Sequence, residues 1–129
     1  MRISLMLCAA ALVLGACHRV NPISEEERIE IDCLSSIAVV EITDYISAGA
    51  DAGTDPADLM HIVPDKIAEA EEKLKGRYGG EMDSAFLEYE INHRLGQFES
   101  AIESGDPESL DYIRMTETLE LGRSCTFGT

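Results

Sequence analysis

The stretch 24–47, SEEERIEIDCLSSIAVVEITDYIS, decides the fold. It opens as a capping box, in which Ser24 is the cap, Glu27 is the third helical residue and three acids stand at the positive end of the helix dipole. Two apolar faces then follow at three- and four-residue spacing, one of Ile29, Cys33, Ile37 and Val40 and one of Leu34, Ala38, Ile42 and Tyr45. We expect a helix to about Ser47, more enclosed by its neighbours than any other helix.

The next segment predicts two helical pieces. The glycines of Ala48–Gly53 suit a helix stop, and Asp55-Pro56 suits a new start, because proline at the first helical position loses no hydrogen bond. A short helical piece is expected to end at about Val63. Pro64 is expected to break or kink it, and a surface helix with a thin apolar stripe is expected over residues 65–77.

The clearest helical periodicity lies further along, after the break predicted at Gly79-Gly80. Apolar residues recur there at spacings of four, four, three and four: Leu87, Ile91, Leu95, Phe98 and Ile102. We expect a helix that opens at Glu81 or Asp83 and ends near Ser104-Gly105.

A last helix is predicted to begin at Asp106-Pro107-Glu108, which repeats the cap-and-proline pattern, and to fray over Thr126–Thr129. Its apolar stripe consists of Tyr112, Met115, Leu119 and Gly122. No β segment or repeat is evident. The sequence therefore predicts an all-α fold, a small four-helix antiparallel bundle.

The chain begins with MRISLMLCAAALVLGAC, a positive residue, an uncharged apolar run over Ile3–Leu14, and a small-residue site, Leu14-Gly15-Ala16-Cys17. The run is shorter than the roughly 20 residues that span a bilayer, and is typical of a secretory signal. These seventeen residues resemble the signal and lipobox of bacterial lipoproteins. The resemblance implies that Cys17 is diacylated, that cleavage precedes it, and that the new N-terminus is acylated, palmitate being one such lipid.

On this interpretation residues 1–16 are a signal peptide, 17–23 a lipidated tether and 24–129 the helical domain. The lipid would anchor the chain on the periplasmic side of the cell envelope. One acyl chain binds a protein to a membrane only marginally, whereas two or three acyl chains anchor it stably. His18 is not the aspartate that resembles a retention signal for the inner membrane, which favours the outer membrane. An ordinary secretory signal and an uncleaved anchor are the alternatives.

Two cysteines remain for structure, because Cys8 leaves with the signal and Cys17 carries lipid. An export signal places Cys33 and Cys125 in an oxidising compartment, where a distant pair is most simply a disulfide. It would close a loop of roughly ninety residues and contribute about 4 kcal/mol on the chain-entropy model. A redox role is the alternative, but neither cysteine lies in a C-x-x-C motif.

The charge of the chain is strongly acidic, with 10 Lys and Arg against 25 Asp and Glu. Loss of Arg2 with the signal changes the net charge from −15 to −16. Such a surface argues against nucleic acid as a partner, since phosphates are held by Lys and Arg clusters. Solubility explains the acidity without a partner. The sharper hypothesis is a cationic partner in the envelope, either a protein, a peptide or divalent cations.

Two sets of residues are candidates for functional sites, one for a metal site and one for an interaction surface. Asp58-x-x-His61 and Glu90-x-x-His93 have the carboxylate-histidine spacing of di-metal bundles, but His93 points away from the apolar stripe of its helix. Phe86 and Tyr89 flank that stripe and could be partly exposed at an interaction surface, although packing against a second helix explains them too. No hydrolase or phosphate-loop motif is present.

From these observations we expect a non-enzymatic binding or structural module without a cofactor or metal. A metal-binding or di-metal helical bundle that uses Asp58, His61, Glu90 and His93 is the alternative.

Overall fold

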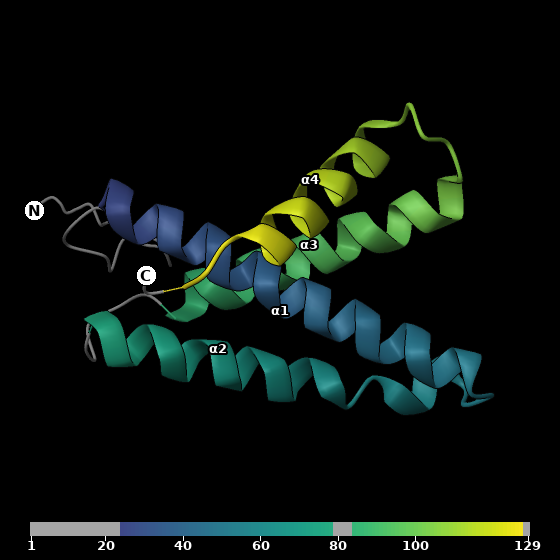
Figure 1. The fold of residues 1–129 in the computed structure, drawn as a ribbon, viewed down its shortest axis with the longest axis horizontal. Helices are drawn as coiled ribbons and strands as arrows, with labels where there is room; N and C mark the ends of the chain where they lie inside the picture. The colour runs from purple at the N-terminus through teal and green to yellow at the C-terminus, as the bar shows by residue number, and fades with distance from the viewer. Residues whose placement is uncertain (1–23, 79–83, 128–129) are drawn as a thin grey trace, which may run out of the picture.

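Helices account for the fold of the described residues, 24–78 and 84–127, in the computed structural model (Figure 1). The elements are α1 (Glu25–Asp51), a 3₁₀ helix η2 (Pro56–Leu59), α2 (Ile62–Tyr78), α3 (Ser84–Ser104) and α4 (Leu110–Ser124). The fold is an all-α bundle, as predicted. The predicted signal, lipidation site and tether, the break at Gly79-Gly80 and the helix start at Glu81 or Asp83 lie outside the described residues.

Helix α1 is the centre of the bundle and packs against η2 and the three other helices. Its start is capped as predicted, because the Glu27 amide donates to Ser24 Oγ at 3.1 Å. Five of its side chains enter the main core cluster with residues of α2 and α3: Ile31, Leu34, Ala38, Val39 and Ile42 from α1, with Ile67, Ala70, Leu74, Leu87 and Ile91. The prediction that this helix is the most enclosed is confirmed, although Ile29 is 60% exposed.

The end of α1 lies at Asp51, one turn beyond the predicted Ser47. Gly49 does not stop the helix; a Cβ at Gly49 would overlap the Leu59 side chain, so the missing side chain lets η2 pack against α1. The chain turns at Gly53, whose φ of 94° is a left-handed conformation that favours glycine.

Pro64 neither breaks nor kinks a helix, which corrects the prediction. Helix α2 begins at Ile62, so Pro64 lies in its first turn, where its missing N–H has no partner to lose. The interruption falls instead at Met60 and His61, between η2 and α2.

Two boundaries around α4 differ from the prediction. Asp106 caps a turn, since its Oδ1 accepts from the Glu108 amide at 3.0 Å, and the helix itself starts three residues later with Ser109 as the cap. At the other end, Phe127 packs against the core instead of fraying.

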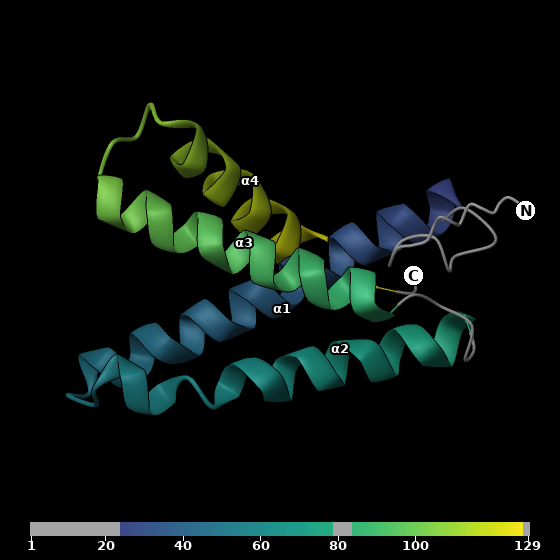
Figure 2. The same ribbon diagram turned by 180° about the vertical axis from the view of Figure 1, so that it is seen from behind.

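The four helices form two antiparallel hairpins, α1–α2 and α3–α4, that are close at one end and diverge at the other (Figures 1 and 2). The close approach of α4 to α1 occurs at Gly122, where a Cβ would overlap the Ser36 carbonyl oxygen and the Val40 side chain. The diverging end carries the α1–η2 and α3–α4 connections, and we call it the open end.

Arg94 ties three helices together at the crossing. From α3 it donates to Thr118 Oγ1 on α4 and to Asp32 Oδ1 on α1, both at 3.1 Å. A second tie joins α2 to α1, because Lys66 forms an ion pair with Glu41 at 3.1 Å. Hydrogen bonds to Glu41 and then Glu69 raise the pKa of Lys66 above its usual value.

Among the described residues, α1 alone has the length and apolar composition to cross a membrane. Half of its most apolar window is buried within the bundle (50%), and it contacts every other helix. These contacts make it the core helix of the domain.

Candidate binding groove

The two structural cysteines form the predicted disulfide. Cys33 on α1 and Cys125, the C-terminal cap of α4, have Cα atoms 6.0 Å apart and are 92 residues apart in sequence. A shallow pocket of about 350 Å³ lies beside the bond, between Ile29, Leu121 and Phe127. The bond fixes the end of α4 to the first half of α1, and so holds the hairpins together at the end opposite the groove described below.

The carboxylate-histidine pairs lie on separate elements with separate partners. Asp58 is in η2 and His61 follows it; the His61 ring packs edge-on against Tyr45, with centroids 5.9 Å apart. On α3, Glu90 forms an ion pair with Arg94 at 3.5 Å, and His93 is exposed, as its position on the helix predicted. Within residues 24–78 and 84–127 no group of three or more His, Cys, Asp or Glu is arranged to hold a metal ion.

The two predicted interaction residues have different environments. Phe86 is half-buried against the core, and the Arg28 guanidinium covers its ring, 5.4 Å from the centroid. Tyr89 is 59% exposed and stacks on His93, with ring centroids 5.6 Å apart. Tyr45 is also exposed, Tyr112 is half-buried, and the side chain of Tyr78 lies outside the description. Tyr89 is therefore the more accessible member of the predicted pair.

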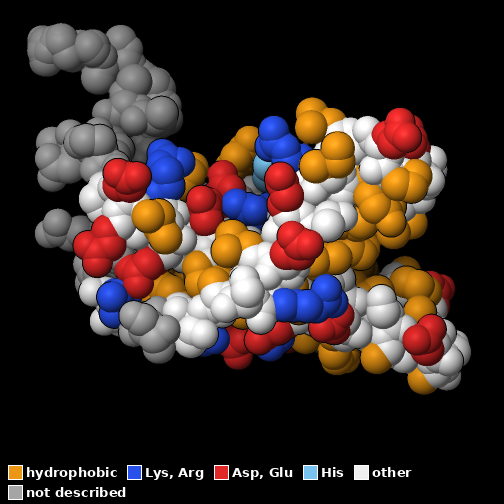
Figure 3. All heavy atoms as spheres, turned by 45° about the horizontal axis from the view of Figure 1, so that its top comes forward, with side chains coloured by type: hydrophobic (Ala, Val, Ile, Leu, Met, Phe, Trp, Pro, Cys, Tyr) orange, Lys and Arg blue, Asp and Glu red, His pale blue; other side chains and the backbone are white. Residues whose placement is uncertain are grey.

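A groove of about 560 Å³ lies at the open end, and we call it the hairpin groove. One wall is the second half of α1 with η2 and the start of α2, and the other wall is α3. Its apolar lining consists of Ile42, Ile46, Pro56, Met60, Val63, Leu95, Phe98 and Ile102. Figure 3 shows hydrophobic side chains in the notch between the two hairpins.

Two large apolar side chains at the edge of the groove are unusually exposed. Met60 is 50% exposed and Ile102 is 62% exposed. Ile102 is the last member of the apolar periodicity of α3, yet its side chain lies outside the core. The preceding residue, Ala101, is fully buried, and near its end α3 lies away from the α1–α2 hairpin and beside α4 (Figure 1).

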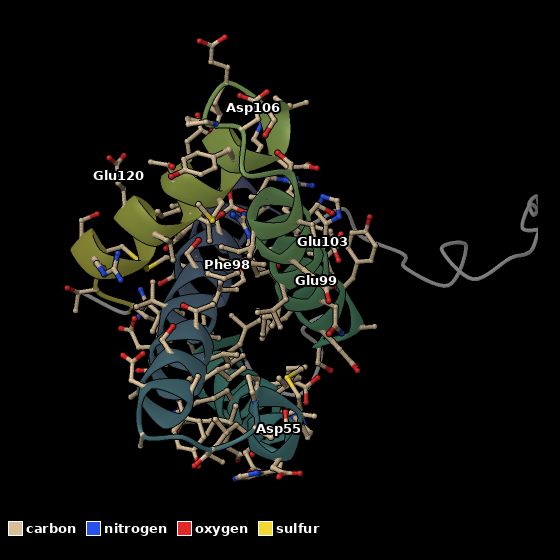
Figure 4. The ribbon with its side chains drawn as sticks, turned by 90° about the vertical axis from the view of Figure 1, so that its right-hand side faces the viewer. Asp55, Phe98, Glu99, Glu103, Asp106 and Glu120 are labelled. Atoms are coloured by element: carbon tan, nitrogen blue, oxygen red, sulfur yellow. A yellow bond between two sulfur atoms is a disulfide. The ribbon has the colours of Figure 1, made fainter. Side chains whose placement is uncertain are left out.

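The charges at the hairpin groove are of one sign. Among the described residues that line it, Glu99 and Glu103 are the ionised side chains, with no Lys, Arg or His. In Figure 4 both glutamates lie on α3, Phe98 points toward the space between the hairpins, and Asp55 lies at the opposite edge beside η2. Within the part of the chain that the structure describes, Glu99 and Glu103 form no ion pair.

Sequence reasoning missed this groove, although part of its signal was present. The apolar spacing along α3 continues to Ile102, one turn beyond the part of the helix that packs in the core. Glu99 and Glu103 lie on an adjacent face of the same helix. The positions of Met60 and Pro56 opposite them depend on how η2 folds back, which no local pattern specifies.

Comparison of the chain with models of protein families, with curated proteins and with solved structures finds no match in any of the three. The site is therefore interpreted from its own chemistry. The hairpin groove offers apolar surface and unpaired carboxylates, a combination suited to binding a partner that is apolar on one side and cationic at its flanks.

Proposed function

We propose that this chain is a lipid-anchored, non-enzymatic binding module of the bacterial cell envelope, and that its acidic surface holds a cationic envelope protein or peptide. The observation that carries the proposal is the excess of carboxylates over basic side chains. The chain has 25 Asp and Glu against 10 Lys and Arg.

Among the described residues, four basic side chains form ion pairs that join α1 to another helix, and Arg114 pairs with Glu117 within α4. The four are Lys66, Arg77, Arg94 and Arg123. Because these cations are already neutralised locally, the remaining carboxylates set a negative potential over the surface. Such a potential attracts cationic partners and repels acidic ones. The attraction grows with the charge of the partner and falls as the salt concentration rises.

The location rests on the lipobox, Leu14-Gly15-Ala16-Cys17, and is supported by the disulfide. A bond between Cys33 and Cys125 is of the kind that forms and persists in oxidising compartments such as the periplasm. Acylation of Cys17 would hold the domain near the membrane, because residues 18–23 of the tether reach only about 20 Å when extended. On this proposal the partner is met at or near the membrane surface.

The alternative, a metal-binding bundle, gains no support from the geometry of Asp58, His61, Glu90 and His93 described above. Metal analysis of the chain purified without chelator separates the two proposals. Stoichiometric iron, zinc or manganese would favour the metal-binding alternative over ours.

The test of the binding proposal is a pull-down from envelope extract with the oxidised, tagged full chain at low and at high salt. We expect a stoichiometric basic protein or peptide that is lost at high salt, because screening weakens contacts between exposed charges. An unrelated acidic helical protein of equal net charge is the control bait. Recovery of the same proteins on both baits, or of none on the chain, would contradict the proposal.

A further inference from the structure

We propose that the hairpin groove is the docking site of a cationic amphipathic helix, which lays its apolar face between α1 and α3 and its basic residues against Glu99, Glu103 and Asp55. This inference rests on the proposed function and deepens it, because it assigns the place and the form of the cationic partner. It rests on the apolar floor of the groove, on the acidic residues at its edges and on the helices that form its walls.

The floor of the groove is apolar and already shaped. Ile42, Ile46, Leu95 and Phe98 face it from α1 and α3, and Met60 and Ile102 extend the apolar surface outward at its edges. Exposed apolar residues scattered singly are ordinary, but here two that are at least half exposed adjoin one continuous hollow. A flexible methionine at the edge suits a surface that adapts to its partner.

The edges of the groove determine the charge of the partner. Glu99 and Glu103 are exposed on the α3 side, and Asp55 is exposed on the opposite side. Because no basic side chain lines the groove in the described residues, a basic residue at either flank of a bound helix meets a carboxylate and no repulsive charge. The same carboxylates repel an acidic partner, including a second copy of this chain, whose net charge is −15.

The placement of these carboxylates is unfavourable for α3 itself. Glu99 and Glu103 are four residues apart on one helix, and Glu103 lies in the last turn, where the dipole disfavours negative charge. Helix α3 has no basic residue in that turn to offset them. A cationic partner would relieve both repulsions, so the arrangement is better matched to the bound state than to the free one.

The walls of the groove determine the form of the partner. The described residues that line the groove belong to helices and to the turn between η2 and α2, so the groove offers no sheet edge to which an extended peptide could add. A helix that presents apolar residues at i, i+3, i+4 and i+7 fills such a groove with side chains alone.

The test titrates the full chain, purified oxidised and held in vesicles of zwitterionic phosphatidylcholine, with a designed helix of about 16 residues. The peptide carries leucines on one face, lysines at both flanks, and a single tryptophan on the apolar face. The chain itself contains no tryptophan, so a blue shift larger than that seen with protein-free vesicles reports burial of the peptide on the chain. We expect saturable binding that weakens at least tenfold between about 20 mM and 500 mM salt.

Three variants and two matched controls locate the site. Glu99→Gln with Glu103→Gln should weaken binding about fivefold, whereas Glu71→Gln with Glu72→Gln, an equal loss of charge on α2, should change it less than twofold. Gly96→Gln places a side chain in the groove where the structure has open space, and should weaken binding about tenfold. Ile102→Ser should also weaken binding about tenfold. Ile29→Ser is its control, because it removes an almost equally exposed isoleucine beside the disulfide and should leave binding unchanged.

The outcomes separate the site from the function. Binding that is salt-sensitive but unaffected by Gly96→Gln and Ile102→Ser would agree with a cationic partner and would show that the partner binds outside the groove. Equal affinity for an uncharged version of the helix would overturn the assignment of a cationic partner. A monomer–dimer equilibrium that Ile102→Ser abolishes would place a second copy in the groove and overturn the proposal.

Discussion

Gly122 shows how a single missing side chain sets the architecture. A Cβ at this position would overlap the backbone oxygen of Ser36 and the side chain of Val40, so α4 lies directly on α1 only because the residue is glycine. The contact lies where the two hairpins cross, and it determines how closely α4 can approach the core helix.

Gly122→Ala is therefore expected to destabilise the fold. The overlap is with backbone, which cannot rotate away, so the free energy of unfolding should fall by about 1–3 kcal/mol. Gly76→Ala is the matched control, because a Cβ there meets nothing within 4 Å. It should raise stability by about 0.5–1 kcal/mol through helix propensity. Urea unfolding of both variants measures the difference, and equal effects at the two sites would contradict the close approach.

At the scale of elements, α4 depends on the disulfide more than any other helix does. Thr118 is its one buried residue among those described, and its apolar residues Leu110, Ile113 and Leu121 are exposed. Helix α4 is held by the Gly122 crossing, by polar contacts of Arg94 with Thr118 and of Arg123 with Asp44, and by the bond between Cys33 and Cys125.

Reduction and alkylation of Cys33 and Cys125 should lower the free energy of unfolding by about 2–4 kcal/mol. Because the core cluster lies in α1, α2 and α3, amides of α4 should lose their protection against hydrogen exchange first. Hydrogen exchange of the oxidised and reduced chain, followed by mass spectrometry, makes the comparison. Uniform loss of protection in all four helices would show that α4 is as well anchored by packing as the others.

Helix α3 carries a charge arrangement that costs stability. Glu99→Gln with Glu103→Gln should raise the free energy of unfolding by about 0.3–1 kcal/mol, because it removes a like-charge pair and an acid at the C-terminal end of the helix. The same double change at Glu71 and Glu72, in mid-α2, should stay within about 0.5 kcal/mol of zero. Thermal unfolding at low salt tests this, and a loss of stability at Glu99 and Glu103 would mean that they are structural.

The elements were more predictable than their exact ends and faces. The cap at Ser24, the enclosure of α1 and the pairing of Cys33 with Cys125 follow from local chemistry and from the antiparallel order of helices. The exposure of Ile102 could not be predicted, because periodicity shows which residues share a helix face and not how far along the helix that face has a neighbour. Pro64 was misassigned because proline suits the first turn of a helix as well as it interrupts one.

At the scale of the whole molecule, the hairpins diverge from a tied end to an open end. The disulfide and the Arg94 hydrogen bonds lie toward the tied end and at the crossing, and the hairpin groove lies at the open end. No local pattern in the sequence encodes this divergence, because it arises from the crossing of α4 over α1. The groove was therefore not predictable from the sequence, whereas the acidity of the surface around it was.

The lipid anchor is a separate prediction at this scale. Cys17→Ser removes the thiol that would be acylated, so the domain should move from the membrane fraction to the soluble periplasm, with its disulfide intact. Fractionation followed by immunodetection measures the change, and Cys8→Ser is the control, because that residue precedes the expected cleavage site. Retention of Cys17→Ser in the membrane fraction would indicate an anchor other than lipid.

The most direct test of the central claim, an acidic module that holds a cationic partner at its open end, is photo-crosslinking in cells. A photoreactive residue replaces Ile102 at the hairpin groove or, as the control, Ile29 near the disulfide, two sites of almost equal exposure. The account predicts a discrete adduct with a basic protein or peptide from Ile102 alone, abolished by Gly96→Gln. The same adducts from both positions, or none from Ile102, would contradict it.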